Sequence, residues 1–205
     1  MRSNNIANGK LADNRILNHL NRYSGILGVK PIGDYQVERW ARKLTPTEQM
    51  ENSINMYLGI DYLVMIQAKG YNLGFIDSSL EGVEGRLISI DTKGFNYSYS
   101  NYGRLKANGE VELMLLQVEK LVGKHKYNGW ANDPNHKVEY LLILVNDHLY
   151  YMDYKKLVSY CSRFNRNNCK WKTFNKTNGY EICIQATVDD LKANGVIFNI
   201  ERLVN

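Results

Sequence analysis

The stretch RLISIDTKGF, residues 86–95, combines a predicted β-strand with two side chains of opposite charge. We expect the strand to cover roughly residues 86–94. Successive side chains of a strand point to opposite faces, so Asp91 and Lys93 share one face while Thr92 points to the other. The segment therefore predicts a carboxylate and an ammonium group side by side at the end of a strand.

This pairing of Asp91 with Lys93 suits the cleavage of phosphodiester bonds. The carboxylate would bind a hard divalent cation through oxygen. The lysine would position the attacking water or the scissile phosphate and offset developing charge. The alternative is an ordinary ion pair on the edge of a sheet, and the triplet alone leaves both interpretations open.

Asp61 lies upstream, within the apolar run MYLGIDYLVMIQA, for which we expect a buried strand over about residues 57–67. An ionised carboxylate in such a run is costly unless another group compensates its charge. Backbone N–H groups or an arginine would satisfy it in a purely structural role. A cation shared with Asp91 is the functional alternative, because two carboxylates on adjacent strands leave coordination sites open for water and phosphate.

The N-terminal part of the chain predicts helices before the first strand. A short helix is expected within residues 1–24, and SGILGVKPIG (24–33) is expected to be a loop because it holds three glycines and a proline. A helix over 34–44 would begin at Asp34. Thr45 and Glu48 form a capping box, which predicts a further helix to about Asn55.

The rest of the chain alternates between predicted helices and strands. Residues 70–85 are expected to be a loop or hairpin insertion, and 95–109 an irregular segment. The elements that follow are a helix over 110–122, a hairpin around Asn146-Asp147, a helix from Asp153, strands turning at Asn178-Gly179, and a helix from Thr187 to Gly195. This order predicts a mixed α/β or α+β fold with a central mixed sheet flanked by helices.

Length and composition are those of a globular protein. The 205 residues suit one domain over 1–205, with a helical and loop extension over 1–33 and a core over 34–205. No long apolar stretch is present and the first residues are polar, so we expect no secretory leader, no membrane association and a cytoplasmic location in a bacterium or a phage-infected host cell. The net charge of +5 suits a polyanionic partner without requiring one. Three cysteines without a Cys-x-x-Cys pair predict free thiols, with a metal site at Cys161 and Cys169 as the alternative.

The segments GIDYLV and ISIDTKG together resemble the PD-(D/E)XK nuclease superfamily, over roughly residues 34–122. An isoleucine precedes Asp61 where the motif is named for a proline, and the spacing needs an insertion over 68–85. The resemblance implies a restriction-endonuclease-like fold with a sheet flanked by helices. It implies Asp61 and Asp91 as ligands of Mg²⁺, for which Mn²⁺ would substitute, and Thr92 as a ligand through its carbonyl. It implies Lys93 as the residue that positions the attacking water.

The same family often supplies a further glutamate from a helix before the first strand. Glu51 is the preferred candidate for this catalytic position, and Glu48 is the candidate for a metal ligand although it also belongs to the capping box. Glu38 is the third candidate. Other residues are expected to bind nucleic acid because basic and aromatic side chains suit phosphate contacts and base stacking: Arg86, Arg104, Lys106, Tyr97, Arg163, Arg166 and Lys170.

Taken together, these patterns predict a metal-dependent endonuclease acting on DNA, of the restriction, junction-resolving or phage kind, with RNA as the alternative substrate. A homodimer is a further expectation, because cutting two strands suits two-fold symmetry. Two alternatives stay open. The first is a nucleic-acid-binding or inhibitor protein without catalysis, and the second is an interaction protein whose acidic residues are structural.

Overall fold

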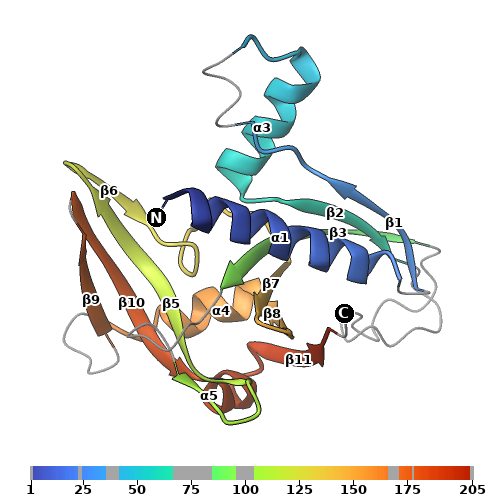
Figure 1. The fold of residues 1–205 in the computed structure, drawn as a ribbon. Coiled ribbons are helices and arrows are strands. Elements are labelled where there is room, and N and C mark those ends of the chain that lie inside the picture. Colours follow the sequence, from blue (N-terminus) through green and yellow to red (C-terminus); the bar gives the residue numbers. More distant parts are fainter. Residues whose placement is uncertain are drawn as a thin grey trace. The chain divides into compact units, whose positions relative to one another are not determined.

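The computed structural model describes residues 2–22, 25–35, 42–66, 85–95, 104–165, 171–176 and 178–203 (Figure 1). Helices and strands alternate along them, which confirms the expected mixed α+β class. The chain divides into two compact units. The first comprises Met1–Gly94 and Asn135–Leu144, and the second comprises Phe95–Pro134 and Val145–Asn205. The expectation of a single domain over 1–205 stays a prediction.

The first unit contains a sheet whose strands lie in the order β1-β2-β3-β7. Its elements are α1 (Arg2–Leu20), β1 (Ile26–Pro31), α3 (Pro46–Leu58), β2 (Tyr62–Ile66), β3 (Arg86–Phe95) and β7 (Tyr140–Val145). β2 is antiparallel to both β1 and β3. The sheet brings together strands that are far apart in the sequence, because β7 joins β3 after a long excursion of the chain.

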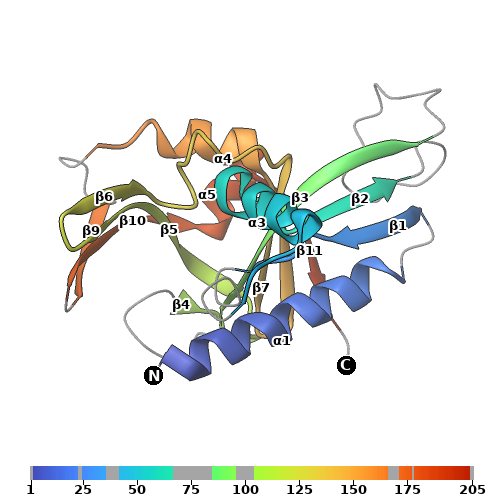
Figure 2. The ribbon, with the colours of Figure 1, turned by 90° about the horizontal axis from the view of Figure 1, so that it is seen from above.

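Helix α1 covers one face of this sheet (Figure 2). Its buried residues Ala12, Ile16 and Leu20 recur every four positions and so form one apolar stripe. The facing strands contribute the buried residues Tyr62, Val64, Ile66, Ile88 and Ile90. The Tyr62 hydroxyl donates a hydrogen bond to the carbonyl of Asp13 at 3.3 Å, which ties the helix to β2.

Helix α3 begins as the sequence predicts. Thr45 and Glu48 form a complete capping box, and Pro46 occupies the first turn. The helix continues to Leu58, where Gly59 ends it with φ of +69° and donates its N–H to the carbonyl of Asn55 at 3.0 Å. The strand expected from residue 57 therefore begins only at Tyr62, and Asp61 stands at its start rather than in its interior.

Two other expectations for this unit change. The segment 24–33 was expected to be a loop, but Ile26–Pro31 forms β1, because pairing with β2 outweighs the local turn signals of glycine and proline. The helix expected over 34–44 and the insertion over 70–85 fall largely on residues 36–41 and 67–84, which lie outside the described residues. Residues 42–45, which are described, are not helical.

The second unit contains strands β4 (Arg104–Leu105), β5 (Val111–Val122), β10 (Gly179–Thr187) and β9 (Trp171–Lys176) in that order. β6 (His125–Asn128) also pairs with β5, and β8 (His148–Asp153) pairs antiparallel with β11 (Ile197–Arg202). Two helices complete the unit, α4 (Tyr154–Cys161) and α5 (Val188–Ala193). Asp153 and Thr187 cap them, and Asn178-Gly179 joins β9 to β10, as the sequence predicts.

The helix expected over 110–122 is wrong. The segment is strand β5, which pairs with β10 along most of its length and with β4 and β6 on its other edge. Glutamate, leucine, methionine and lysine favour a helix locally, but neighbours on both edges satisfy the backbone of a strand. Met114, Leu116 and Val118 are buried two residues apart, as on one face of a strand, and Leu115 between them is buried as well. The strands β6 and β11 were also missed.

Among the described residues, no helix is both long and apolar enough to cross a membrane. The thiols of Cys161 and Cys183 are free and buried, as expected, and burial raises the pKa of each to about 12. Cys169 lies outside the described residues, so the alternative of a metal site at Cys161 and Cys169 stays untested.

Gly59 ends α3 two residues before Asp61, and its substitution tests the backbone conformation of this connection. We expect Gly59→Ala to destabilise the protein by more than Gly123→Ala in urea-induced unfolding. Both glycines have positive φ, which costs an L-residue about 1–2 kcal/mol. A Cβ at Gly59 would also lie 2.7 Å from the His136 ring, whereas a Cβ at Gly123 meets nothing within 4 Å. Equal losses for the two variants would show that the His136 contact has no energetic role.

Candidate active site

The register of β2 on β3 brings Asp61 and Asp91 opposite each other. Tyr62 is paired with Ile90, so one further step in this antiparallel pair places Asp61 across from Asp91. The Asp61 N–H donates to the carbonyl of Ile90 at 2.9 Å, which keeps Asp61 beside β3. On the other side, the Ile32 N–H donates to the carbonyl of Asp61 at 2.8 Å. Asp61 is therefore held between neighbouring strands even though it precedes β2.

The carboxylate of Asp61 accepts hydrogen bonds from two elements. Its Oδ1 accepts from Asn55 Nδ2 of helix α3 at 2.8 Å. Its Oδ2 accepts from both the N–H and the hydroxyl of Thr92, each at 2.8 Å. Thr92 is the residue between Asp91 and Lys93, so these bonds bring the Asp61 carboxylate to the predicted triplet.

Asp91 is almost completely buried, with 1% of its surface exposed. Its Oδ1 accepts from Lys93 Nζ at 2.5 Å, which confirms that the two side chains share a face. Its Oδ2 is buried and has no hydrogen-bond partner among the described residues. Burial raises the pKa of Asp91 to about 8; Lys93 opposes the rise, and the negative charge of Asp61 adds to it.

Lys93 is held at the same place by two acceptors. Besides Asp91, its Nζ donates to the carbonyl of Thr92 at 3.0 Å, so the oxygen predicted to bind metal already accepts from the lysine. Burial alone would lower the pKa of Lys93, but the neighbouring charges of Asp91 and Asp61 raise it above its usual value. The side chain keeps 28% of its surface exposed and so remains accessible to a ligand.

Asp13 of helix α1 joins this cluster, which the sequence analysis missed. Its Oδ1 lies 2.9 Å from the Thr92 hydroxyl, which also contacts Asp61. A hydroxyl has a single hydrogen and cannot donate to both carboxylates at once. Burial raises the pKa of Asp13, and the hydrogen bond with Thr92 opposes the rise. The available signal was that Asp13 is the one acidic residue within positions 1–24.

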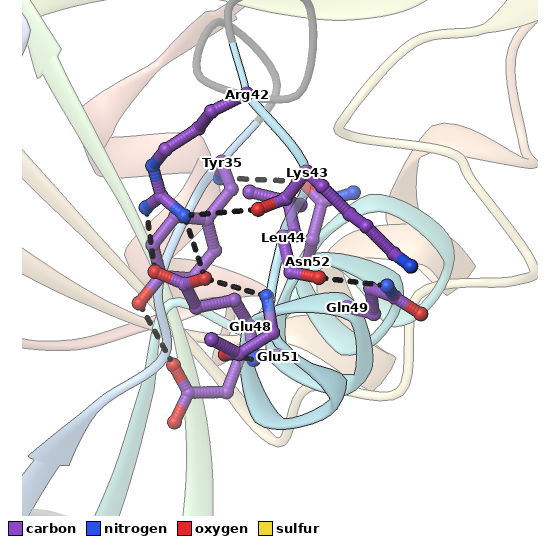
Figure 3. Close-up of polar contacts among 9 residues, drawn as sticks. Tyr35, Arg42, Lys43, Leu44, Glu48, Gln49, Glu51 and Asn52 are labelled. Carbon is purple, nitrogen blue, oxygen red and sulfur yellow. Dashed lines mark hydrogen bonds and ion pairs between the residues drawn. The ribbon is translucent and has the colours of Figure 1, made fainter.

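The helix glutamates predicted for the site have other partners (Figure 3). Glu48 accepts from Arg42 at 2.6 and 2.8 Å and from the Thr45 N–H at 2.8 Å, and the Arg42 contact lowers the pKa of Glu48 to about 2. Glu51 accepts from the Tyr35 hydroxyl at 3.3 Å and lies 3.5 Å from Lys30 Nζ.

Helix α3 therefore reaches Asp61 with an amide rather than a carboxylate. Asn55 lies one turn beyond Glu51, on the last turn before Gly59, and this position brings its side chain to Asp61. The carboxylates of Glu48 and Glu51 are engaged by other residues, namely Arg42, Thr45, Tyr35 and Lys30, and their predicted roles stay predictions. Glu38 lies outside the described residues.

The residues predicted to bind nucleic acid are spread over both units. Arg86, in the first unit, forms an ion pair with Glu139. In the second unit, Arg104 pairs with Glu112 and Lys106 lies 3.8 Å from Glu110. Arg163 donates to Asn194 at 2.6 Å. Tyr97, Arg166 and Lys170 lie outside the described residues.

The donor set fits a hard cation in its chemistry. The structure describes no group of three or more Asp, Glu, His or Cys side chains arranged to hold a metal ion in the ranges that it covers. The charges of Asp61 and Asp91 nevertheless influence each other, and Asp91 Oδ2 is an oxygen acceptor without a donor among the described residues. A buried acceptor of this kind needs a proton or a cation. A divalent ion would be held by Asp61 and Asp91.

Asp91→Asn tests the electrostatics of the cluster in the presence of EDTA. The pKa of Asp91 in the folded protein lies above the usual 3.8. The protonated carboxyl group therefore contributes fully to the free energy of unfolding below pH 3.8, and this contribution is lost as the pH rises towards 8. The stability of the variant relative to the original chain should therefore increase between pH 4 and pH 8, by at most about 1.4 kcal/mol per pH unit. Urea unfolding at several pH values measures it. The exposed Asp189 supplies the control, Asp189→Asn, for which we expect no such trend; a flat difference for Asp91→Asn would contradict the expectation.

The cluster thus contains three aspartates from α1, the start of β2 and β3, with one lysine and one amide beside them. Asp91 is buried, and Asp13 and Asp61 are partly exposed. The acceptors of the cluster outnumber its donors, since one hydroxyl serves two carboxylates and one carboxylate oxygen has no donor. No protein-family model, no curated protein and no solved structure matches this chain.

Proposed function

We propose that this protein is a Mg²⁺-dependent nuclease that hydrolyses phosphodiester bonds of DNA, with its active site at Asp61, Asp91 and Lys93. The observation that carries the proposal is the buried Oδ2 of Asp91, which has no hydrogen-bond partner in the described part of the chain and belongs to a carboxyl group that also interacts with the charge of Asp61. Two facing carboxylates are the usual means by which a protein binds Mg²⁺ while leaving positions for water and substrate.

The side chains of the cluster have separable roles in this reaction. When bound, Mg²⁺ supplies a Lewis acid that polarises the phosphate and lowers the pKa of a water molecule. Lys93 presents a positive charge, held by Asp91 and the Thr92 carbonyl, against which a phosphate oxygen or the attacking water is oriented. Asn55 and Thr92 fix the orientation of the Asp61 carboxylate.

DNA is the proposed substrate on account of overall charge. The chain carries 26 lysines and arginines against 21 aspartates and glutamates, which favours a polyanion. An endonuclease acting as a homodimer is part of the same proposal, with RNA as the alternative substrate. Mn²⁺ would replace Mg²⁺, because both accept oxygen ligands in octahedral geometry.

A second candidate function is nucleic-acid binding without catalysis. The observation that favours it is that three of the four oxygens of Asp61 and Asp91 already accept hydrogen bonds within the protein. In that case a proton rather than a cation would neutralise the buried carboxyl group of Asp91, whose pKa is raised. The two functions differ in whether the protein binds divalent metal and in whether it cleaves nucleic acid.

Cleavage assays with matched variants separate these functions. Supercoiled, linear and branched DNA would be incubated with Mg²⁺, Mn²⁺ or EDTA. Asp91→Asn should abolish metal-dependent cutting, and Lys93→Met should lower the rate about 10²–10³-fold by removing charge stabilisation. Glu48→Gln and Glu51→Gln should cut like the original chain, because other partners hold both glutamates.

Calorimetric titration with Mn²⁺ provides a second measurement on the same proteins. The original chain and Lys93→Met should bind the ion, whereas Asp91→Asn should not. Circular dichroism would verify that each variant is folded. DNA binding in EDTA without either Mn²⁺ binding or cleavage would overturn the nuclease and leave the non-catalytic function.

A further inference from the structure

The second unit presents a sheet surface on which lysines and aromatic rings alternate. It is one face of the strands β6, β5, β10 and β9, which lie next to one another in this order (Figure 1). We call it the basic sheet face and define it by its lysines and rings: Lys120, His125, Tyr127, Lys172, Phe174 and Lys176. It includes none of the residues of the aspartate cluster.

The strand register places these side chains on a common face. Phe174 is paired with Glu181, Glu181 with Lys120, and Lys120 with Tyr127, so one row crosses all four strands. A second row runs from Lys176 through Gly179 and Val122 to His125. Residues that are directly opposite in antiparallel strands share a face, as do residues two apart in one strand. Lys172 belongs to the same face because it lies two residues before Phe174.

This face is turned to solvent within its unit. Tyr127 keeps 48% of its surface exposed and Val122 keeps 53%, which is high for apolar side chains of a sheet. Lys120, Lys172 and Lys176 are exposed as well, and Phe174 is half-buried. A sheet face that packed a core would instead bury its aromatic residues.

Charge is distributed unequally between the two faces. On the basic sheet face, three lysines accompany one glutamate, Glu181, whose carboxylate lies 3.2 Å from Lys176 Nζ. On the opposite face, Glu119 accepts from the Tyr180 hydroxyl at 2.8 Å and pairs with Lys126 at 2.7 Å. Among the residues that the structure describes, positive charge therefore remains uncompensated mainly at Lys120 and Lys172 on the basic sheet face.

The rings and the ammonium groups are close enough to act on one ligand. Lys120 Nζ lies 5.7 Å from the centre of the Tyr127 ring, and the ring centres of His125 and Tyr127 are 6.4 Å apart. An exposed ring beside an ammonium group provides a stacking surface and a phosphate contact within one nucleotide's reach. Neighbouring strands are about 4.8 Å apart, so the four strands extend these contacts over about 14 Å.

From these observations we infer that the basic sheet face binds single-stranded nucleic acid. The lysines contact the phosphate backbone and the rings of Tyr127, His125 and Phe174 stack on unpaired bases. A duplex hides the faces of its bases, so it uses only the charge of this surface and not its rings. The inference does not rest on the chemistry proposed for Asp91, because it concerns binding by another unit of the chain.

Fluorescence anisotropy with a labelled dT20 oligonucleotide tests the inference. The titrations contain EDTA, so that no strand is cut, and are repeated at several salt concentrations. Lys120→Gln combined with Lys172→Gln should reduce the slope of log affinity against log salt by about 1.4, since each phosphate contact on a single strand contributes about 0.7. Tyr127→Ala should weaken binding about tenfold through the loss of one stacked base.

Lys126→Gln is the matched control, because Lys126 lies on the same strand as Tyr127 but on the opposite face. Its affinity and salt slope should equal those of the original chain. Unchanged binding in the double lysine variant, or an equal loss in Lys126→Gln, would overturn the inference. Tighter binding to duplex DNA, to a poly-glutamate peptide or to phosphatidylserine vesicles than to dT20 would also overturn it. If the original chain binds dT20 but shows no metal-dependent cleavage, the result would contradict the proposed nuclease function and leave the inference on the basic sheet face intact.

Discussion

The antiparallel pairing of β2 with β3 is the constraint on which the aspartate cluster depends. With Tyr62 opposite Ile90, the next residues of the two chains are the aspartates 61 and 91. A shift of one residue would turn the side chains of one strand to the other face. The buried side chains beneath α1 oppose such a shift, because Val64 and Ile88 would lose their place in the core. The hydrophobic core thus determines the geometry of the polar site, although none of the core residues belongs to that site.

The cluster shows how a fold tolerates buried charge. Asn55, Thr92 and Lys93 supply donors to two carboxylates, and each of these donors lies within or next to a regular element. The donors are nevertheless too few, as the partnerless Oδ2 of Asp91 and the shared hydroxyl of Thr92 indicate. An arrangement that lowers the stability of the protein alone is typical of sites whose function supplies the missing ligand. This shortage of hydrogen-bond donors supports the proposed metal site more directly than the sequence motif does.

The two units are assigned complementary roles. The first holds the carboxylates and the lysine to which chemistry is attributed, and the second presents lysines and aromatic rings on an exposed sheet. Charge alone did not identify that surface. β9 contributes Lys172, Phe174 and Lys176, and strand pairing brings Lys120, His125 and Tyr127 beside them from residues 120–127.

Local signals in the sequence determined the helix starts, one turn and the principal strand. The capping box at Thr45, the caps at Asp153 and Thr187, and the turn at Asn178-Gly179 were all predicted, because each depends on hydrogen bonds between residues a few positions apart. The proximity of Asp91 and Lys93 was predictable for the same reason.

Tertiary structure decided the rest. Residues 111–122 became a strand through partners far away in the chain, and Asp13 and Asn55 reached Asp61 and Thr92 through the packing of two helices, which no local pattern encodes.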